Sequence, residues 1–199
     1  MSFTIKSLFK KSSETFFVRF IGVAFNYLFL LTISNQYNAN GMGMFAYYQS
    51  LLLIFSIIPQ FGIHTSVIKF ISELNFNIPE IKKVIFKCIV ISISISFIFM
   101  LLLYLLRDAN IFFKDNLNLS FYFIISILPF AIMNLLSEVC RSFDKIKLFI
   151  LYKYTLLPLI SFLVIYLSSF TISPIYAYII SIYLILFLSI LSVFYTLYN

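Results

Sequence analysis

The chain has 199 residues, of which 62% are hydrophobic and only 11% charged, and its mean hydropathy is +1.06. Soluble domains average about half apolar and about a quarter charged residues, and a chain of this length cannot hide so much Ile, Leu and Phe in one core. Composition therefore excludes a soluble globular protein and predicts an all-α, polytopic membrane protein. The net charge of +7 does not indicate nucleic-acid binding, because the basic residues lie in short clusters between long apolar runs.

Residues 1–15 are too polar to cross a bilayer, and their mixture of apolar and lysine side chains predicts a short amphipathic helix at the membrane interface. Six apolar runs follow, each close to the roughly 20 residues that one crossing needs. The predicted transmembrane helices are about 16–36, 44–68, 84–106, 120–140, 149–169 and 174–197, and together they form one transmembrane lobe, 16–199.

The connections between these spans carry typical turn and loop residues. Asn and Gly at 38–43 predict a tight turn after the first span. Polar stretches at 72–83, 107–119 and 141–147 predict loops, and Pro174 suits the first turn of the last helix. The Ile/Ser alternation at 91–96 resembles a strand, but it lies within more than about 20 apolar residues, so we predict a helix there.

The basic residues predict the orientation. With the N-terminus on the cytoplasmic side, every Lys and Arg except Arg107 and Lys114 falls on that side or near it. The positive-inside rule therefore places both termini in the cytoplasm. We therefore expect a multi-pass membrane protein, and the richness in Ile, Lys, Asn and Phe is typical of an AT-rich bacterial genome.

The sequence offers few residues for an enzyme. His64 is its only histidine, its acidic residues are scattered, and it has no Asp-x-Asp, Gly-x-Ser-x-Gly or Gly-rich phosphate loop. We therefore predict no catalytic activity, no metal site and no cofactor. Cys88 and Cys140 lie in or beside apolar runs, which predicts free, buried and inert thiols.

Polar side chains inside the spans are the candidate functional residues, because they are costly in a bilayer. Arg19 and Lys153 either extend to the interface or face a cavity. Asn26 and Gln60, like Gln49 and Asn134, either join helices through hydrogen bonds or line a hydrated path. Glu138 and Arg141 are three residues apart on one helix, a spacing that predicts an ion pair.

Several segments carry a resemblance to a known family when they are taken in order. The succession Gly41-Met42-Gly43-Met44-Phe45, Gln60-Phe61-Gly62-Ile63, Val67-Ile68-Lys69-Phe70 resembles the second helix of polysaccharide flippases. The stretch Arg141-Ser142-Phe143-Asp144-Lys145 with Leu156-Leu157-Pro158-Leu159 is similar to the loop and fifth helix of that family. Arg19-Phe20-Ile21-Gly22 is similar to an Arg-x-x-Gly motif in the first helix of the related lipid II flippases.

This resemblance covers nearly the whole chain and implies the oligosaccharidyl-lipid exporter superfamily. Its members flip undecaprenyl-pyrophosphate-linked oligosaccharides across the cytoplasmic membrane for surface polysaccharide or O-antigen assembly. They have two six-helix lobes around a cavity with alternating access. The resemblance thus implies the inner, cytoplasmic membrane as the location of this chain. A cationic cavity suits a pyrophosphate, so the resemblance implies Arg19 as the first substrate-binding residue and Lys153 as the second, with Asn26 and Gln60 as further candidates.

The chain departs from the family in length, because members have 12 or more spans. The resemblance therefore implies the N-terminal lobe alone, from a disrupted or incompletely read gene and inactive unless it associates with a second lobe or with itself. The expected partners are a lipid-linked oligosaccharide and membrane lipids. One alternative is a small six-span accessory or structural protein that acts through helix–helix contacts. A membrane-bound glycosyl- or acyltransferase is the other, and the missing acidic and His clusters count against it.

Overall fold

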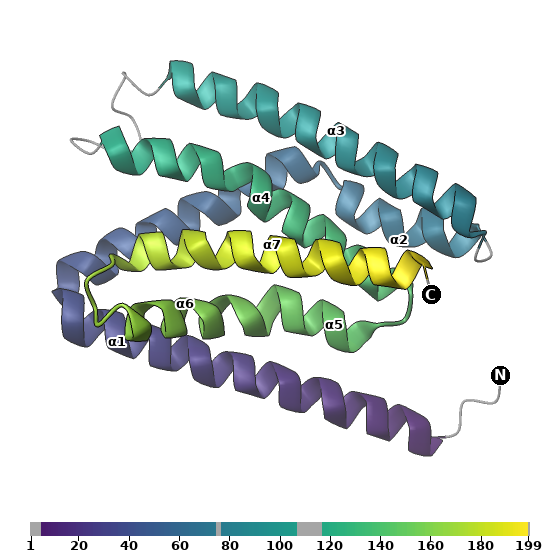
Figure 1. Cartoon of the computed structure of the whole chain (residues 1–199), viewed down its shortest axis with the longest axis horizontal. Helices are drawn as coiled ribbons and strands as arrows, with labels where there is room; N and C mark the ends of the chain where they lie inside the picture. Colours follow the sequence, from purple (N-terminus) through teal and green to yellow (C-terminus); the bar gives the residue numbers. More distant parts are fainter. Residues whose placement is uncertain (1–4, 75–76, 107–116, 199) are drawn as a thin grey trace.

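The computed structural model describes residues 5–74, 77–106 and 117–198. The described residues are all-α and form six helices, of which α1 is bent (Figure 1). They are α1 (Ile5–Gln60), α2 (Ile63–Glu73), α3 (Ile78–Leu105), α4 (Leu117–Ser142), the unbroken series α5 (Ile146–Ile150), η2 (Leu151–Thr155) and α6 (Leu156–Leu167), and α7 (Pro174–Tyr198). Five of the six are long and apolar enough to cross a membrane, α2 being the exception.

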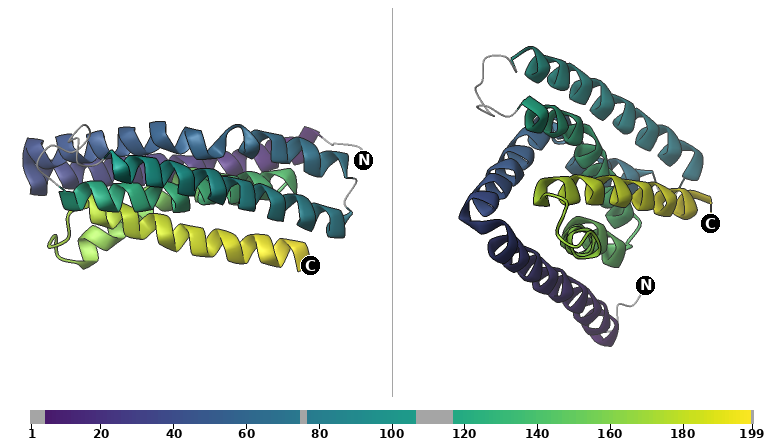
Figure 2. Two further views of the ribbon diagram at one scale, coloured as in Figure 1. Left: turned by 90° about the horizontal axis from the view of Figure 1, so that it is seen from above. Right: turned by 60° about the vertical axis from the view of Figure 1, so that its left-hand side comes forward.

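Helix α1 is bent sharply at Asn38, whose φ of 57° and ψ of −177° are not helical. The bend divides α1 into a first arm, 5–37, and a second arm, 39–60, which form a V (Figure 2, right). Asn accepts a positive φ more readily than most residues. The predicted turn over 38–43 is therefore wrong beyond Asn38, because the helix resumes at Ala39.

The structure refines further predictions in the N-terminal half of the chain. Residues 5–15 of the predicted amphipathic segment 1–15 are helical, and they join the predicted first span without a break, because α1 begins at Ile5. The predicted second span, 44–68, is interrupted at Phe61 and Gly62, both with positive φ. Gly62 adopts the left-handed conformation that commonly ends a helix. The helical residues of α2 and α3 also shorten the predicted 72–83 loop to the junction between Glu73 and Ile78.

The remaining predicted spans agree well with the structure. The 91–96 alternation lies within α3 as a helix, and α7 begins at Pro174. The fifth span contains a π-helical turn, Leu151–Thr155, which ends three residues before Pro158. Proline has no N–H and its ring conflicts with the carbonyl four residues earlier, here that of Tyr154, so a locally widened helix fits this position. Most of the predicted loop 107–119 lies outside the described residues.

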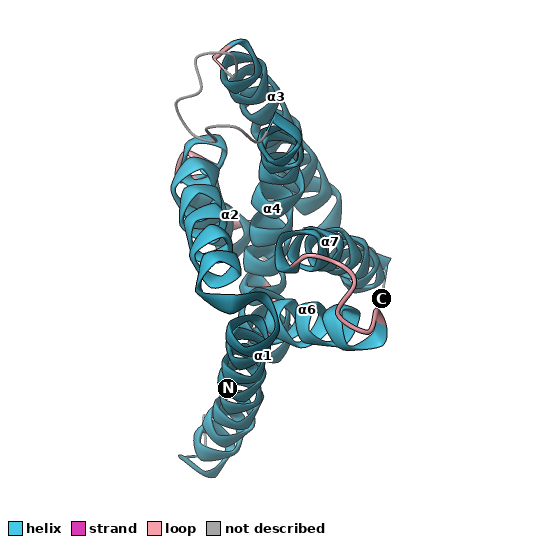
Figure 3. Cartoon of the chain, turned by 90° about the vertical axis from the view of Figure 1, so that its left-hand side faces the viewer, coloured by secondary structure: helices cyan, strands magenta, loops and turns pink. Residues whose placement is uncertain are grey.

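Helix α4 is the centre of the bundle. In the most apolar stretch of α4, 78% of the residues are buried, whereas the share is at most 44% in any other candidate span. Figure 3 shows it between the other helices. Aromatic side chains join the two arms of α1 to each other, and the second arm to α4 and α7. The Phe29 and Phe45 rings are 5.2 Å apart, Phe45 and Tyr178 5.5 Å, and Tyr48 and Phe123 5.6 Å.

Among the residues that the structure describes, the two ends of the bundle differ in charge. The start of α1 and the end of α7 lie at the same end of the bundle as the end of α2, the start of α3 and the α4–α5 turn (Figure 1). This end, called the basic end below, carries Lys69, Lys82, Lys83, Lys145 and Lys147. The Asn38 bend and the α6–α7 connection lie at the opposite end. Apolar side chains are exposed along the length of the helices, as at Phe17, Phe97 and Phe187, each more than 60% exposed. A bilayer is the solvent that suits such a surface.

Candidate functional site

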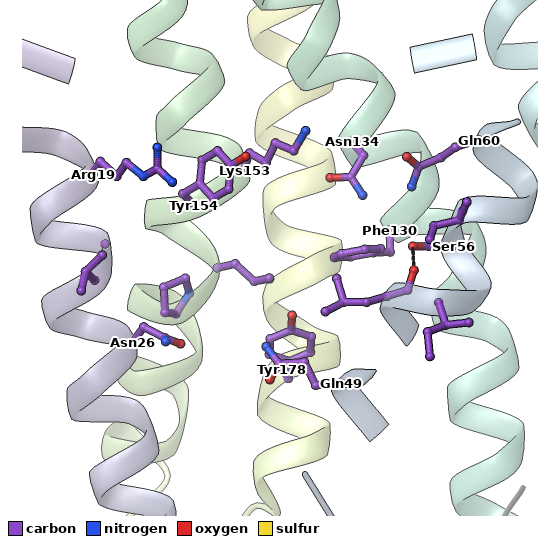
Figure 4. Close-up of a pocket in the computed structure, with 17 residues that line it drawn as sticks. Arg19, Asn26, Gln49, Ser56, Gln60, Phe130, Asn134, Lys153, Tyr154 and Tyr178 are labelled. Atoms are coloured by element: carbon purple, nitrogen blue, oxygen red, sulfur yellow. Dashed lines mark hydrogen bonds between the residues drawn. The ribbon is translucent and has the colours of Figure 1, made fainter. Parts of the chain in front are cut away.

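A cavity of about 590 Å³ lies between the arms of α1, and α4, η2, α6 and α7 complete its walls. All four predicted substrate-binding residues line it: Arg19 and Asn26 from the first arm, Gln60 from the second arm, and Lys153 from η2. Figure 4 shows Arg19 and Asn26 on one side of the cavity and Gln60 on the other. The structure thus brings together residues that are far apart in the sequence.

The first arm is held against η2 by unusually close backbone packing. A Cβ built on Gly22 would lie 2.7 Å from the Tyr154 carbonyl oxygen and 2.9 Å from the Thr155 Cα, so only glycine fits this contact. The Thr155 hydroxyl also donates a hydrogen bond of 2.9 Å to the Val18 carbonyl. Because Gly22 and Arg19 are three residues apart on one helix, this contact fixes the place of the arginine.

Arg19 packs on an aromatic ring and contributes an uncompensated charge. Its guanidinium carbon lies 5.1 Å from the centroid of the Tyr154 ring, a cation–π distance. No carboxylate of the described residues pairs with it, and the nearest acidic residue along the helix, Glu14, pairs instead with Lys147 at 3.6 Å. Arg19 is therefore a cation that can bind an anionic group entering the cavity.

Lys153 has a different environment, because it is paired. Its Nζ donates a 2.7 Å hydrogen bond to Oε1 of Glu138, whose side chain is only 4% exposed. The other carboxylate oxygen of Glu138 accepts from Arg141 Nη1 at 3.5 Å, so the predicted Glu138–Arg141 pair is confirmed. Lys153 is the closer partner. The ammonium at the cavity wall is thus largely neutralised, and Arg19 remains the stronger anion-binding group.

Several cavity residues were not among the predicted site residues. Gln49, Ser56, Asn134 and Tyr178 add polar atoms to the walls. Asn134 and Ser56 are 8% and 2% exposed within the chain. In the sequence, Gln49 and Asn134 are recognisable as polar residues inside predicted spans. Nothing in the sequence marks Ser56 and Tyr178 as cavity residues. Amide and hydroxyl groups of this kind can hydrogen-bond to sugar hydroxyls, so the cavity combines a cation with neutral polar groups.

The described residues contain no group of three or more His, Cys, Asp and Glu side chains that could hold a metal ion. Cys88 and Cys140 are free and buried, as predicted. The single histidine, His64, lies in α2, and its Nδ1 is buried without a hydrogen-bond partner. The chemistry that the cavity supports is binding through charge and hydrogen bonds.

Comparison with known proteins adds no family assignment. No protein-family model matches the chain, and no curated protein or solved structure matches it either. The flippase resemblance therefore rests on the sequence segments described above.

Proposed function

We propose that the chain is one lobe of a flippase for undecaprenyl-pyrophosphate-linked oligosaccharides, with the cavity between the α1 arms as its substrate-binding half. The observation that carries the proposal is the meeting of Arg19, Asn26, Gln60 and Lys153 at one cavity. An unpaired arginine suits a pyrophosphate, and the surrounding amides suit a glycan. The volume of about 590 Å³ is within the usual range of ligand sites.

The proposal includes six membrane crossings, with each arm of α1 making one. Each arm exceeds the roughly 20 residues that a crossing needs. The lysines gathered at the basic end support a cytoplasmic location for that end and for both termini, by the positive-inside rule. The inner membrane is the expected compartment, and a second lobe or a second copy of the chain would complete the cavity.

The direct test is binding of the proposed substrate to the purified chain in lipid nanodiscs. We expect Arg19→Ala to weaken binding of undecaprenyl-pyrophosphate oligosaccharide by roughly tenfold or more, as for loss of a charged hydrogen bond. Microscale thermophoresis would measure the affinity.

The matched control is Lys69→Ala, which removes a cation that is 77% exposed and outside the cavity. This variant should bind as the unmodified chain does. Equal loss in both variants would mean that binding depends on net charge, and the substrate assignment would fail.

A second test distinguishes a flippase lobe, in which the face that carries Arg19 is hydrated, from an accessory protein, in which that face packs against another helix without water. The proposed cavity is hydrated, so a cysteine in place of Arg19 should react with a water-soluble maleimide in membranes. Phe20→Cys is the control, since Phe20 is 61% exposed but does not line the cavity. The native thiols are buried and should react little. Equal labelling at both positions would contradict a hydrated face.

A further inference from the structure

A second hollow of about 410 Å³ lies elsewhere on the bundle, between α3 and α7. The buried side chains of Ile132 and Leu136, 8% and 2% exposed, form its floor on α4. Its sides are apolar apart from Lys82 and come from Ile85, Phe86, Ile89 and Ile93 on α3 and Leu186, Ile190, Val193, Phe194 and Leu197 on α7. We call it the α3–α7 groove.

The α3–α7 groove and the polar cavity lie on opposite faces of α4. Phe130 and Asn134 line the cavity, whereas Ile132 and Leu136 line the groove. Residues two apart on an α-helix differ by about 200° around its axis. The apolar groove therefore faces away from the polar cavity, and its occupant is separate from the proposed substrate.

One end of the groove is charged. Lys82 lies in the second turn of α3, and its Nζ is 3.9 Å from the centroid of the Tyr198 ring near the end of α7. No carboxylate of the described residues pairs with Lys82. Lys145, a second cation at this end, donates a 2.9 Å hydrogen bond to Thr196 of α7. Lys82 is thus the cation that remains available at the mouth, close to the positive end of the α3 dipole.

The length of the groove matches one leaflet. On α3 its lining runs from Lys82 to Ile93, which is about 16 Å at a rise of about 1.5 Å per residue. The hydrocarbon core of a bilayer is about 30 Å thick, so one leaflet contributes about 15 Å. A cation at the basic end followed by about one leaflet of apolar wall is the shape of a phospholipid, with its phosphate at the interface and one acyl chain extending inward.

We propose that the α3–α7 groove binds an anionic phospholipid of the leaflet at the basic end, with one acyl chain along Ile132 and Ile190 and the phosphate at Lys82. The floor and walls supply apolar contact, and Lys82 selects for negative charge. The site is independent of the proposed flippase function.

Native mass spectrometry of the whole chain tests this assignment, with phosphatidylglycerol and phosphatidylcholine of identical chains in equal amounts. We expect one phosphatidylglycerol to be retained in preference to phosphatidylcholine. Lys82→Glu should lower that retention about fivefold or more. The control Lys83→Glu, with the same charge change on an exposed neighbour outside the groove, should lower it less than about twofold.

A second pair of variants tests the acyl chain. Ile190→Trp fills the groove and should reduce retention of both lipids, whereas Leu191→Trp, at a similarly exposed position outside the groove, should change neither. Equal effects of the two lysine variants, or normal retention in Ile190→Trp, would overturn the site. Displacement of the lipid by excess inorganic phosphate, or preferential retention of undecaprenyl phosphate, would also overturn the assignment to a phospholipid. If Lys82→Glu does not fold, Lys82→Gln takes its place, and the retention of phosphatidylglycerol and phosphatidylcholine is compared in the same way.

Discussion

At the scale of single residues, the Glu138–Lys153 pair is the feature that should matter most for stability. Glu138 is 4% exposed and Lys153 25% exposed, so neither charge is well solvated. Removing one partner of such a pair leaves the other charge buried. We expect Lys153→Met to lower the free energy of unfolding by about 3 kcal/mol, near the low end of the usual range because Arg141 still contacts Glu138. Thermal unfolding in detergent micelles would measure it.

Two companion variants make this prediction specific. Adding Glu138→Gln to Lys153→Met should restore most of the lost stability, because the uncompensated charge is gone. Lys147→Met breaks the exposed pair with Glu14, whose side chains are 60% and 46% exposed, and should cost less than about 1 kcal/mol. Additive losses in the double variant would show that the pair is not coupled.

At the scale of elements, the contact between the first arm of α1 and η2 depends on Gly22. We expect Gly22→Ala to lower stability by about 1–3 kcal/mol, because the new methyl group would meet the Tyr154 carbonyl and the Thr155 backbone. Gly43→Ala makes the same change in the second arm, where nothing lies within 4 Å, and should be neutral or raise stability by up to about 1 kcal/mol. The melting temperatures of the two variants provide the comparison, and a loss in Gly43→Ala equal to that in Gly22→Ala would rule out the packing explanation.

At the scale of the whole molecule, the V of α1 decides how the chain threads through the membrane. If each arm makes one crossing, cysteines at Asn40 and Ser169 should react with an impermeant maleimide added outside intact cells. A cysteine at Asp144 should react only after permeabilisation. All three positions are exposed. Labelling of Asn40→Cys and Asp144→Cys from the same side would contradict six crossings.

The elements most accurately predicted from the sequence are those defined by long apolar runs, such as α3 and α7, because hydrophobic length alone determines a crossing. The incorrect predictions concern the places where one helix ends or bends and the next begins. The bend at Asn38 takes one residue where turn composition suggested six, and the polar stretch after Ser72 is partly helical. Local composition marks such places without fixing their backbone angles.

At the candidate site, too, part of the arrangement could be predicted from the sequence and part could not. Arg19, Asn26, Gln60 and Lys153 could be selected because polar groups in a bilayer are costly, and the structure places them at one cavity. The pairing of Lys153 with Glu138 could not be predicted, because it joins residues on α4 and η2 that meet only through tertiary packing. Only the partner three residues along the same helix, Arg141, had a signal in the sequence.

The hydroxyl of Tyr37, next to the bend of α1, donates to the carbonyls of Phe170 and Ile172 at 3.0 and 2.6 Å. These bonds anchor the apex of the V to the α6–α7 connection, so a rotation of the first arm would have its pivot near Tyr37. Arg19 lies roughly 27 Å along the helix from Tyr37, and a rotation of only about 5° there would carry the arginine about 2 Å. A small rotation at Tyr37 would therefore displace Arg19 by a much larger distance than it displaces the residues beside the bend. Such a rotation would have to break the contacts of Val18 and Gly22 with η2.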